Sequence, residues 1–214
     1  MKIVTWNVNS INVRLPNVLQ YLSEYQPDIL CLQELKCSED KYPSDSINSV
    51  GYQTIQACQK TYNGVSIISK DIPKKIEINP VAINSEEMRS ISASINGVRI
   101  INFYVVNGQS IGSDKYSHKL KWLNKAHAYI DSQVKKFEQV LVVGDFNIVP
   151  SETDAHSFSS EDEPIIDVID LLKLSDLISS DNQINHCERG QGDFTGDGLL
   201  NTIDLFAFAT MLAE

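Results

Sequence analysis

The sequence predicts a layered α/β (α+β) protein. Short apolar runs of strand length recur along the chain as far as Asp145, and two longer segments have apolar residues at helical spacing. Strands mixed with helices are typical of proteins built from layers around a shared core. The 214 residues, 42% of them hydrophobic, are enough for one globular domain whose core needs no disulfide bridges.

Strands are expected where apolar residues alternate with polar ones or run together over strand length. The expected strands are residues 2–8, 28–33, 52–58, 64–69, 75–78, 89–95, 98–106 and 140–145. Residues 12–25 and 114–137 predict helices, because apolar residues recur every three or four positions. Asn96-Gly97 between two expected strands is a two-residue hairpin signal. The polar residues 38–49, which include a proline, predict a loop.

Polar side chains stand where three of the expected strands end. Asn7 closes the first strand, Glu34 follows the second, and Asp145 and Asn147 follow the apolar run 140–143. Because polar groups at strand ends can converge on one crevice of a sheet protein, we expect these two acids and two amides to meet. Oxygen ligands of this kind suit a hard divalent cation that also binds phosphate substrates. The sequence therefore predicts a site for Mg²⁺ or Mn²⁺.

The four cysteines form no C-x-x-C pair, and Cys31 lies inside an apolar strand. This usage is typical of a reduced compartment. The N-terminus leads directly into an expected strand without the apolar region of a signal peptide, and no apolar stretch reaches the length of a membrane span. We therefore expect a cytoplasmic protein that does not contact membranes.

The net charge of −10 is unevenly distributed. Residues 1–154 hold 16 acidic and 16 basic residues, whereas residues 155–214 hold 12 acidic and 2 basic ones. The balanced part can still bind nucleic acid through a local basic patch. The acidic part would repel phosphate, although salt screens this repulsion beyond about 8 Å. We interpret it as a solvated acidic segment.

Several segments resemble, in order, the motifs of one family. They are MKIVTWNVN at 1–9, PDILCLQELK at 27–36, YNGVSIIS at 62–69, NFYVVNGQ at 102–109, GSDKY at 112–116 and GDFNIVP at 144–150. Together they resemble the exonuclease III family of apurinic/apyrimidinic (AP) endonucleases, within the endonuclease/exonuclease/phosphatase superfamily. The segment around Tyr104 and Asn107, with Lys119 and Trp122 further on, favours its DNA-repair branch over the lipid and inositol phosphatases.

This resemblance implies a four-layered sandwich of two packed sheets with the active site at one edge. It also implies a Mg²⁺-dependent DNA phosphodiesterase that incises abasic sites and trims 3′ ends in the 3′–5′ direction. Glu34 resembles the main metal ligand, with Asn7 beside it. Asp145 resembles the residue that orients or deprotonates the attacking water, Asn147 a stabiliser of phosphoryl charge, and Tyr104 the tyrosine near the scissile phosphate.

The resemblance also implies contacts to double-stranded DNA. Arg89, Asn107 and Lys119 are the candidates for these contacts, and Asp145 and Asn147 complete the candidate metal-ligand set with Asn7 and Glu34. We expect such an enzyme to act as a monomer on abasic sites or 3′ ends.

The last third of this family carries motifs without counterparts here: a Trp-rich DNA-facing loop, an Asn-Arg-Gly-x-Arg-Ile-Asp strand and a terminal Ser-Asp-His box. We therefore expect a C-terminally truncated member with an incomplete second sheet and impaired activity, because members of a cooperating site act non-additively. There are two alternatives. The chain is an inactive fragment that serves as an interaction module, or it is the product of a gene rearrangement.

The end of the chain resembles a different kind of motif, the calcium loop of dockerin-type repeats. Its candidate Ca²⁺ ligands are Asp193, Thr195, Asp197, the backbone carbonyl of Leu199, Asn201 and Asp204. Gly198 takes the sixth position, where such loops turn sharply. The expected organisation is a nuclease-like domain at 1–180, a linker at 181–192 and a calcium-binding docking tail at 193–214. A protein partner for this tail is part of the same interpretation, and an acidic turn without bound calcium is the alternative.

Overall fold

The computed structural model describes residues 1–84, 86–109 and 112–148. The chain divides into Met1–Asn147 and Ile148–Glu214, so the fold below is that of the first unit. The expected linker and calcium loop lie outside the described residues. Among the described residues, no helix combines the length and apolar character that crossing a membrane would require.

The first sheet has the strand order β1-β2-β4-β3. Its strands are β1 (Ile3–Asn7), β2 (Ile29–Gln33), β4 (Val65–Ser69) and β3 (Gln53–Ala57). β1 and β2 are parallel, and the other pairs are antiparallel. β2 and β4 are buried along their whole length, as their near-continuous apolar sequences predict for central strands.

The second sheet has the order β5-β6-β7-β8. Its strands are β5 (Lys74–Ile78), β6 (Ser90–Ile95), β7 (Val98–Tyr104) and β8 (Val140–Asp145). β7 and β8 are parallel, and the other pairs are antiparallel. The hairpin between β6 and β7 turns at Asn96-Gly97, where φ is 51° and 86°, as a two-residue turn of type I′ requires.

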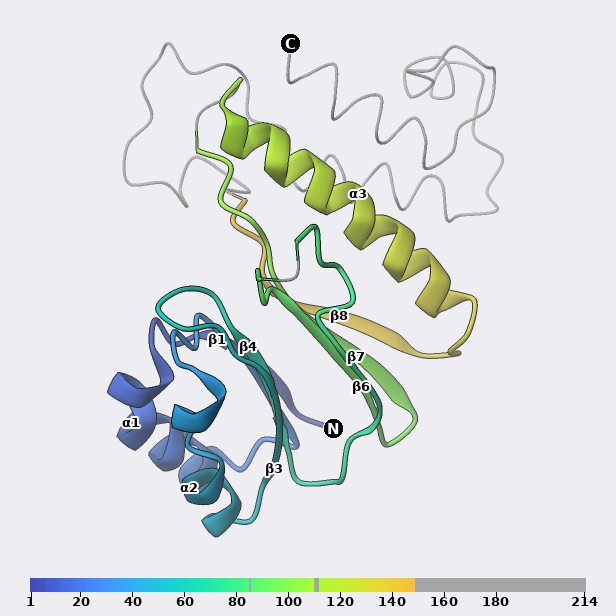
Figure 1. Ribbon diagram of the computed structural model, residues 1–214. Helices are drawn as coiled ribbons and strands as arrows, with labels where there is room; N and C mark the ends of the chain where they lie inside the picture. Colours follow the sequence, from blue (N-terminus) through green and yellow to red (C-terminus); the bar gives the residue numbers. More distant parts are fainter. Residues whose placement is uncertain (85, 110–111, 149–214) are drawn as a thin grey trace, which may run out of the picture. The chain divides into compact units, whose positions relative to one another are not determined.

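Helices cover the outer face of each sheet (Figure 1). α1 (Ile11–Tyr25) and the short α2 (Ser44–Ser49) lie on the first sheet, and α3 (Asp114–Val134) lies on the second. Three apolar clusters fill the interfaces: one between the first sheet and its helices, one between the sheets, and one beneath α3. The described residues therefore form the four layers that the resemblance implies.

Successive side chains of β7 point to opposite faces of the second sheet. Ile101 and Phe103 pack beneath α3 against Trp122, whereas Ile100 and Tyr104 belong to the cluster between the sheets. This is the period of two that a strand imposes on its side chains.

A buried asparagine of β7 joins the two sheets. Asn102 Nδ2 donates to the backbone oxygens of Leu32 (3.0 Å) and Ser66 (2.9 Å), and its Oδ1 accepts from Gln33 Nε2 (2.7 Å). An unpaired polar group at this depth would cost about 1–3 kcal/mol, so the contacts favour one alignment of the sheets. β7 is thereby held against the end of β2.

A fully buried arginine lies at the start of β7 beneath α3. Arg99 Nε donates to Gln133 Oε1 (2.9 Å), and one terminal nitrogen bonds Ser92 Oγ (2.8 Å) and Tyr129 Oη (3.1 Å). The same guanidinium forms an ion pair with Glu77. These contacts join β5, β6, β7 and α3 into one polar cluster.

Two expectations about local structure are wrong. Residues 38–49 were expected to form a loop, but they contain a 3₁₀ turn, Glu39–Lys41, and α2. Pro43 stands at the N-cap, where a proline does not interrupt a helix, and Ile47 is buried in the core. The apolar run 140–143 predicts a buried strand, yet each residue of β8 is partly exposed, because it is the end strand of its sheet among the described residues.

Candidate active site

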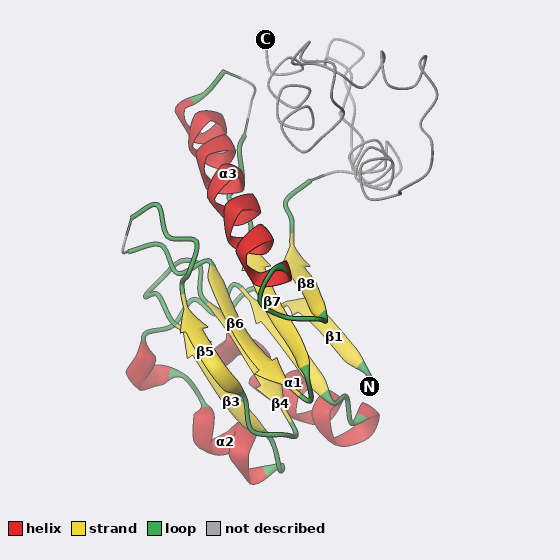
Figure 2. Ribbon diagram, turned by 90° about the vertical axis from the view of Figure 1, so that its right-hand side faces the viewer, coloured by secondary structure: helices red, strands yellow, loops and turns green. Residues whose placement is uncertain are grey.

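Four candidate site residues come together where four strands end. Asn7 is the last residue of β1, Tyr104 of β7 and Asp145 of β8, and Glu34 directly follows β2. The parallel pairing of β7 with β8 sets Tyr104 opposite Asp145. β1 and β8 are in contact although they belong to different sheets, so the two sheets meet at this edge (Figure 2).

One amide connects the two acids. Asn7 Nδ2 donates to Glu34 Oε1 (2.8 Å) and to Asp145 Oδ2 (2.7 Å). Because both bonds start from one nitrogen, the two carboxylate oxygens lie no further apart than the two bond lengths together. Residues separated by more than a hundred positions in the sequence thus form a single acidic centre.

Glu34 has a hydrogen-bonding partner at each carboxylate oxygen. Tyr104 Oη donates to Oε1 (2.9 Å), and Lys36 Nζ lies 2.7 Å from Oε2. Burial alone would raise the pKa of Glu34, but the hydrogen bonds from Asn7, Lys36 and Tyr104 outweigh it and leave the pKa below its ordinary value. Glu34 is therefore an ionised carboxylate at neutral pH.

The backbone at Glu34 is in the left-handed region, with φ of 58°. A non-glycine residue there costs about 1–2 kcal/mol and persists only when its surroundings hold it. Here the Glu34 carbonyl accepts from Ser10 N (2.7 Å), and Leu35 N donates to Gly64 O (3.2 Å). This backbone geometry directs the carboxylate toward Asn7 and Tyr104.

Removing the Glu34 charge is expected to reduce stability in a way that depends on pH. Because the pKa is lower in the folded chain than the unfolded value of about 4.3, the carboxylate stabilises the fold fully above that value. This stabilisation disappears as the pH falls through the folded pKa. In EDTA, the difference in free energy of unfolding between wild type and Glu34→Gln should shrink between pH 7 and pH 3. Urea titrations would measure this difference at each pH. A difference that stays constant would contradict the lowered pKa of Glu34.

Tyr104 is a hydrogen-bond donor at this site. Burial, and then its hydrogen bond to Glu34, raise the pKa of Tyr104 to about 12, so the phenol keeps its proton at neutral pH. The Arg89 guanidinium carbon lies 5.0 Å from the centroid of the Tyr104 ring, and Arg89 Nη1 donates to the Tyr104 carbonyl (3.4 Å). Arg89, a predicted DNA contact, therefore adjoins the acidic centre.

Asp145 and Asn147 form a local turn after β8. Asn147 N donates to Asp145 Oδ1 (3.0 Å), and Asn147 Nδ2 donates to Val105 O (2.8 Å). Lys119 Nζ from α3 donates to Asn147 O (2.7 Å), and burial lowers the pKa of Lys119 while Asp145 opposes this shift. A cation from the helix is thus held beside the acid.

The glycine before Asp145 permits close contact with β7. Gly144 has φ of 147°, and a Cβ atom on it would lie 2.0 Å from the carbonyl oxygen of Phe103. Because the obstructing atom is backbone, a side chain at 144 would force the two strands apart and displace Asp145.

Gly144→Ala is therefore expected to lower the free energy of unfolding by about 1–3 kcal/mol, the usual cost of overpacking. It should also reduce affinity for divalent cations. Urea unfolding and metal titration would test both effects, and Gly97→Ala, where no atom lies within 4 Å of the added Cβ, is the control for positive φ alone. Equal losses in both variants would contradict the steric argument.

Other predicted residues lie apart from the acidic centre or outside the described residues. Asn107 is exposed, and its Oδ1 accepts from Gln109 N (3.0 Å), so it is a peripheral candidate. The six candidate ligands of the calcium loop, between Asp193 and Asp204, lie outside the described residues.

Sequence reasoning missed Lys36, Glu87 and His118. Lys36 stands two positions from Glu34 in the same motif, which was an available signal. Glu87 lies 3.0 Å from His118, a contact between distant segments that no spacing indicates.

The donor set fits a hard divalent cation. Two carboxylates, Glu34 and Asp145, are held close together, with the amide groups of Asn7 and Asn147 beside them. Mg²⁺ is commonly bound by one or two carboxylates together with waters and substrate phosphates, so two acids are enough. Within the described part of the chain, no group of three or more His, Cys, Asp or Glu residues could hold a metal. The two carboxylates and two amides offer oxygen atoms, which suit Mg²⁺, rather than the sulfur and imidazole ligands typical of zinc.

The fold and the site define a class of protein: a two-sheet sandwich with an acidic site where its strands end. The chain belongs to the Endonuclease/Exonuclease/phosphatase family, whose model matches residues 4–202.

Its relatives include DNA-processing enzymes. Exodeoxyribonuclease III of Haemophilus influenzae is 29% identical over 160 residues, 72% of this chain and 60% of that protein. The structure of a 3′–5′ exonuclease from Neisseria meningitidis matches with a TM-score of 0.69 and 40% identity, over 72% of this chain and 61% of that one. An AP endonuclease from Archaeoglobus fulgidus matches with a TM-score of 0.68 and 39% identity, over 73% and 61%. The chain thus spans about three-fifths of the length of each of these proteins.

Proposed function

We propose that this chain is a Mg²⁺-dependent DNA phosphodiesterase of the exonuclease III and AP endonuclease type. The observation that carries the proposal is the Asn7 amide that bonds the carboxylates of both Glu34 and Asp145. The names of the similar proteins support the substrate class, DNA with abasic sites or 3′ ends.

Glu34 is the proposed main ligand for Mg²⁺, with Asn7 beside it. A metal bound there would polarise a phosphoryl oxygen and stabilise the leaving oxygen. The depressed pKa of Glu34 supports this role, because the ligand form is the ionised carboxylate. Mn²⁺, which also accepts oxygen ligands, would serve as a substitute.

Asp145 is the proposed group that orients or deprotonates the attacking water, and with Asn147 it is a further proposed ligand of the same cation. The bond from Asn147 N fixes one carboxylate oxygen, and the bond from Asn7 fixes the other. A positioned base of this kind typically contributes about 10²–10⁴-fold to the rate. The second Nδ2 proton of Asn147 would be donated to a phosphoryl oxygen where negative charge develops. Tyr104 would do the same by exchanging its bond to Glu34 for one to phosphate, since a phenol has one proton to donate.

Arg89 and Lys119 supply positive charge at the border of the site. Both side chains are partly buried and contact residues of the acidic centre or its turn. Such cations would bind the phosphate backbone of double-stranded DNA, with Asn107 further out as an additional contact.

The remaining parts of the proposal concern organisation. A nuclease-like domain at 1–180 and a linker at 181–192 would precede a calcium-binding tail at 193–214 that docks to a protein partner. The loop spacing of acidic and small residues supports calcium binding. A monomeric, cytoplasmic enzyme is proposed from the cysteine usage and from the family resemblance.

A fluorescent duplex with one abasic site tests the proposed activity. Incision is expected with Mg²⁺ or Mn²⁺, is lost in EDTA and returns when Mg²⁺ is added back, because the two acids alone cannot polarise the phosphate. A duplex without the lesion is the substrate control. Absence of incision at high enzyme concentration, or incision that continues in EDTA, would contradict the proposal.

A further inference from the structure

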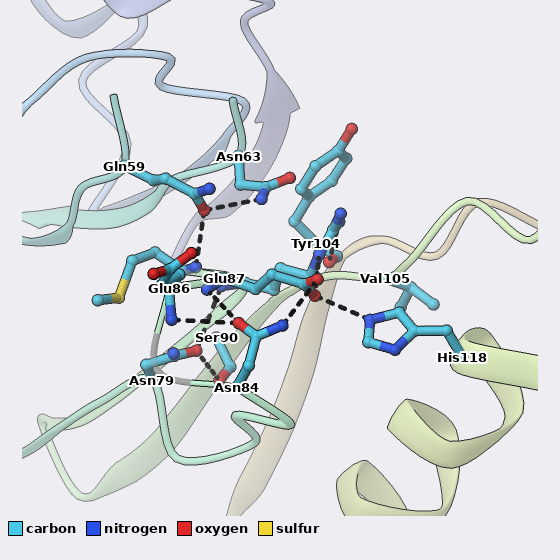
Figure 3. A network of polar contacts seen from close by, with 12 residues as sticks. Gln59, Asn63, Asn79, Asn84, Glu86, Glu87, Ser90, Tyr104, Val105 and His118 are labelled. Carbon is cyan, nitrogen blue, oxygen red and sulfur yellow. Dashed lines mark hydrogen bonds and ion pairs between the residues drawn. The ribbon is translucent and has the colours of Figure 1, made fainter. Parts of the chain in front are cut away.

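A chain of polar contacts connects α3 to the candidate active site through Glu87 (Figure 3). Glu87 Oε2 accepts from Arg89 Nε (3.2 Å) and lies 3.0 Å from His118 Nε2. His118 belongs to α3, whereas Glu87 lies in the segment before β6. One carboxylate oxygen therefore contacts both the helix and the arginine beside Tyr104.

The other oxygen of Glu87 is also held. Asn84 Nδ2 donates to Glu87 Oε1 (3.2 Å), and Asn84 Oδ1 accepts from the backbone nitrogens of Glu86 (3.1 Å) and Glu87 (3.0 Å). Burial alone would raise the pKa of Glu87, but hydrogen bonds from His118 and Asn84 and the nearby charges outweigh it and lower the pKa. Glu87 is thus an oriented, ionised acceptor at neutral pH.

Neighbouring contacts hold the backbone of this segment. Gln59 Oε1 accepts from Met88 N (3.0 Å) and from Asn63 Nδ2 (2.7 Å), and Asn79 Oδ1 accepts from Arg89 N (3.3 Å). These bonds hold the backbone at Arg89 and so restrict where its side chain can reach.

Arg89 is held on both sides of its guanidinium group. Nε bonds Glu87, Nη1 bonds the Tyr104 carbonyl, and the group lies over the Tyr104 ring. Within the described residues these bonds use Nε and Nη1, so Nη2 remains available for a phosphate oxygen. Its side chain is 14% exposed, which leaves few alternative orientations once the bond to Glu87 has formed.

We propose that Glu87, braced by His118, is a positioning residue that holds Arg89 ready to bind a DNA phosphate. This inference rests on the proposed nuclease function and adds Glu87 and His118 to the site. It is an indirect role, since the carboxylate itself would repel phosphate.

The direction in which DNA affinity changes when Glu87 is removed distinguishes a positioning role from an effect of its charge. If Glu87 acted only through its negative charge, removing it would strengthen DNA binding. If it positions Arg89, removing it frees the guanidinium and weakens binding despite the loss of a repelling charge. Glu86 is the matched control, because it is an exposed acid next in the chain whose removal changes the net charge equally.

Fluorescence anisotropy of the full chain with a labelled duplex carrying a stable abasic-site analogue, in EDTA, measures affinity without turnover. Glu87→Ala is expected to weaken binding about five- to tenfold, within the range for the loss of one typical hydrogen bond. Glu86→Ala should bind as tightly as wild type or slightly more tightly. Glu87→Gln should recover part of the loss, since its amide oxygen still accepts from Arg89. His118→Ala should weaken binding about twofold.

Arg89→Ala supplies the second readout. Adding Glu87→Ala to Arg89→Ala should cause no further weakening, because the group that Glu87 positions is already absent. In turnover with Mg²⁺, Glu87→Ala should raise KM more than it lowers kcat. Matching thermal unfolding midpoints of Glu87→Ala and Glu86→Ala would show that the fold is unchanged.

Two results would overturn the proposal. One is a Glu87→Ala variant that binds the duplex at least as tightly as Glu86→Ala. The other is full additivity of the Glu87 and Arg89 substitutions. Failure of the wild-type chain to bind any duplex is a different result, which contradicts the proposed function itself.

Discussion

Asp145→Asn is expected to lower the rate of Mg²⁺-dependent incision of an abasic duplex by about 10²–10⁴-fold, the usual contribution of a positioned base. Asparagine keeps an oxygen that can accept from Asn147 N, so the turn after β8 should remain intact. The substitution removes the negative charge that faces Asn7 and Glu34, and with it the capacity to take a proton from water. Single-turnover rates at saturating enzyme would measure the chemical step.

Asp45→Asn is the matched control for Asp145→Asn. Asp45 is an exposed acid of α2, on the outer face of the first sheet. It should retain the wild-type rate. A wild-type rate in Asp145→Asn as well would contradict the role assigned to Asp145.

Arg99→Ala is expected to lower the free energy of unfolding by about 3–5 kcal/mol. The substitution removes the Arg99 donors from Gln133 Oε1 and from the carbonyl oxygen of Lys75, whereas Ser92 and Tyr129 keep their hydrogen bond to each other. Each polar group left unsatisfied in the interior costs about 1–3 kcal/mol. It also opens a cavity where the guanidinium had packed 4.9 Å from the centroid of the Phe137 ring. Because the cluster joins α3 to the second sheet, the same change should loosen the helix that carries Lys119.

Urea unfolding measures this loss, with Lys74→Ala as the control. Lys74 is an exposed residue of β5, and removing its charge should change stability by no more than about 0.5 kcal/mol. A loss in Arg99→Ala as small as that of Lys74→Ala would mean that the buried cluster contributes little.

Most of the fold was accessible from the sequence because its central strands have unambiguous apolar patterns. The residues of β2 and β4 are buried throughout, as the runs 28–33 and 64–69 indicate. Asn96-Gly97 predicts its hairpin correctly because only a few residue types adopt positive φ easily. Local pattern could not show how the sheets face each other, which depends on Asn102 reaching Leu32 and Ser66 across the interface.

The loop expected at 38–49 shows where composition misleads. Most of its polar residues are exposed or partly exposed, but Tyr42 and Ile47 are buried in the core, and Ile47 is the buried residue that attaches α2. A single buried residue in a six-residue helix gives no periodic signal.

The acidic centre was predictable because each member ends a strand, and strand ends gather at one edge. This argument correctly brings Asn7, Glu34 and Asp145 together. It could not identify Glu87 or His118, since neither ends a strand and their contact depends on how α3 lies across the second sheet. The calcium loop and the domain boundaries remain predictions.

The central claim is that Glu34 and Asp145 form one cation site. Titration of Mn²⁺ into the full chain, followed by the electron paramagnetic resonance signal of free Mn²⁺, tests it most directly. The expected result is one Mn²⁺ site per chain that is weakened at least about tenfold in Glu34→Ala and in Asp145→Ala and further in the double variant, while Asp45→Asn binds as wild type does. Wild-type affinity in either single variant, or two Mn²⁺ sites per chain of which each substitution removes only one, would contradict it.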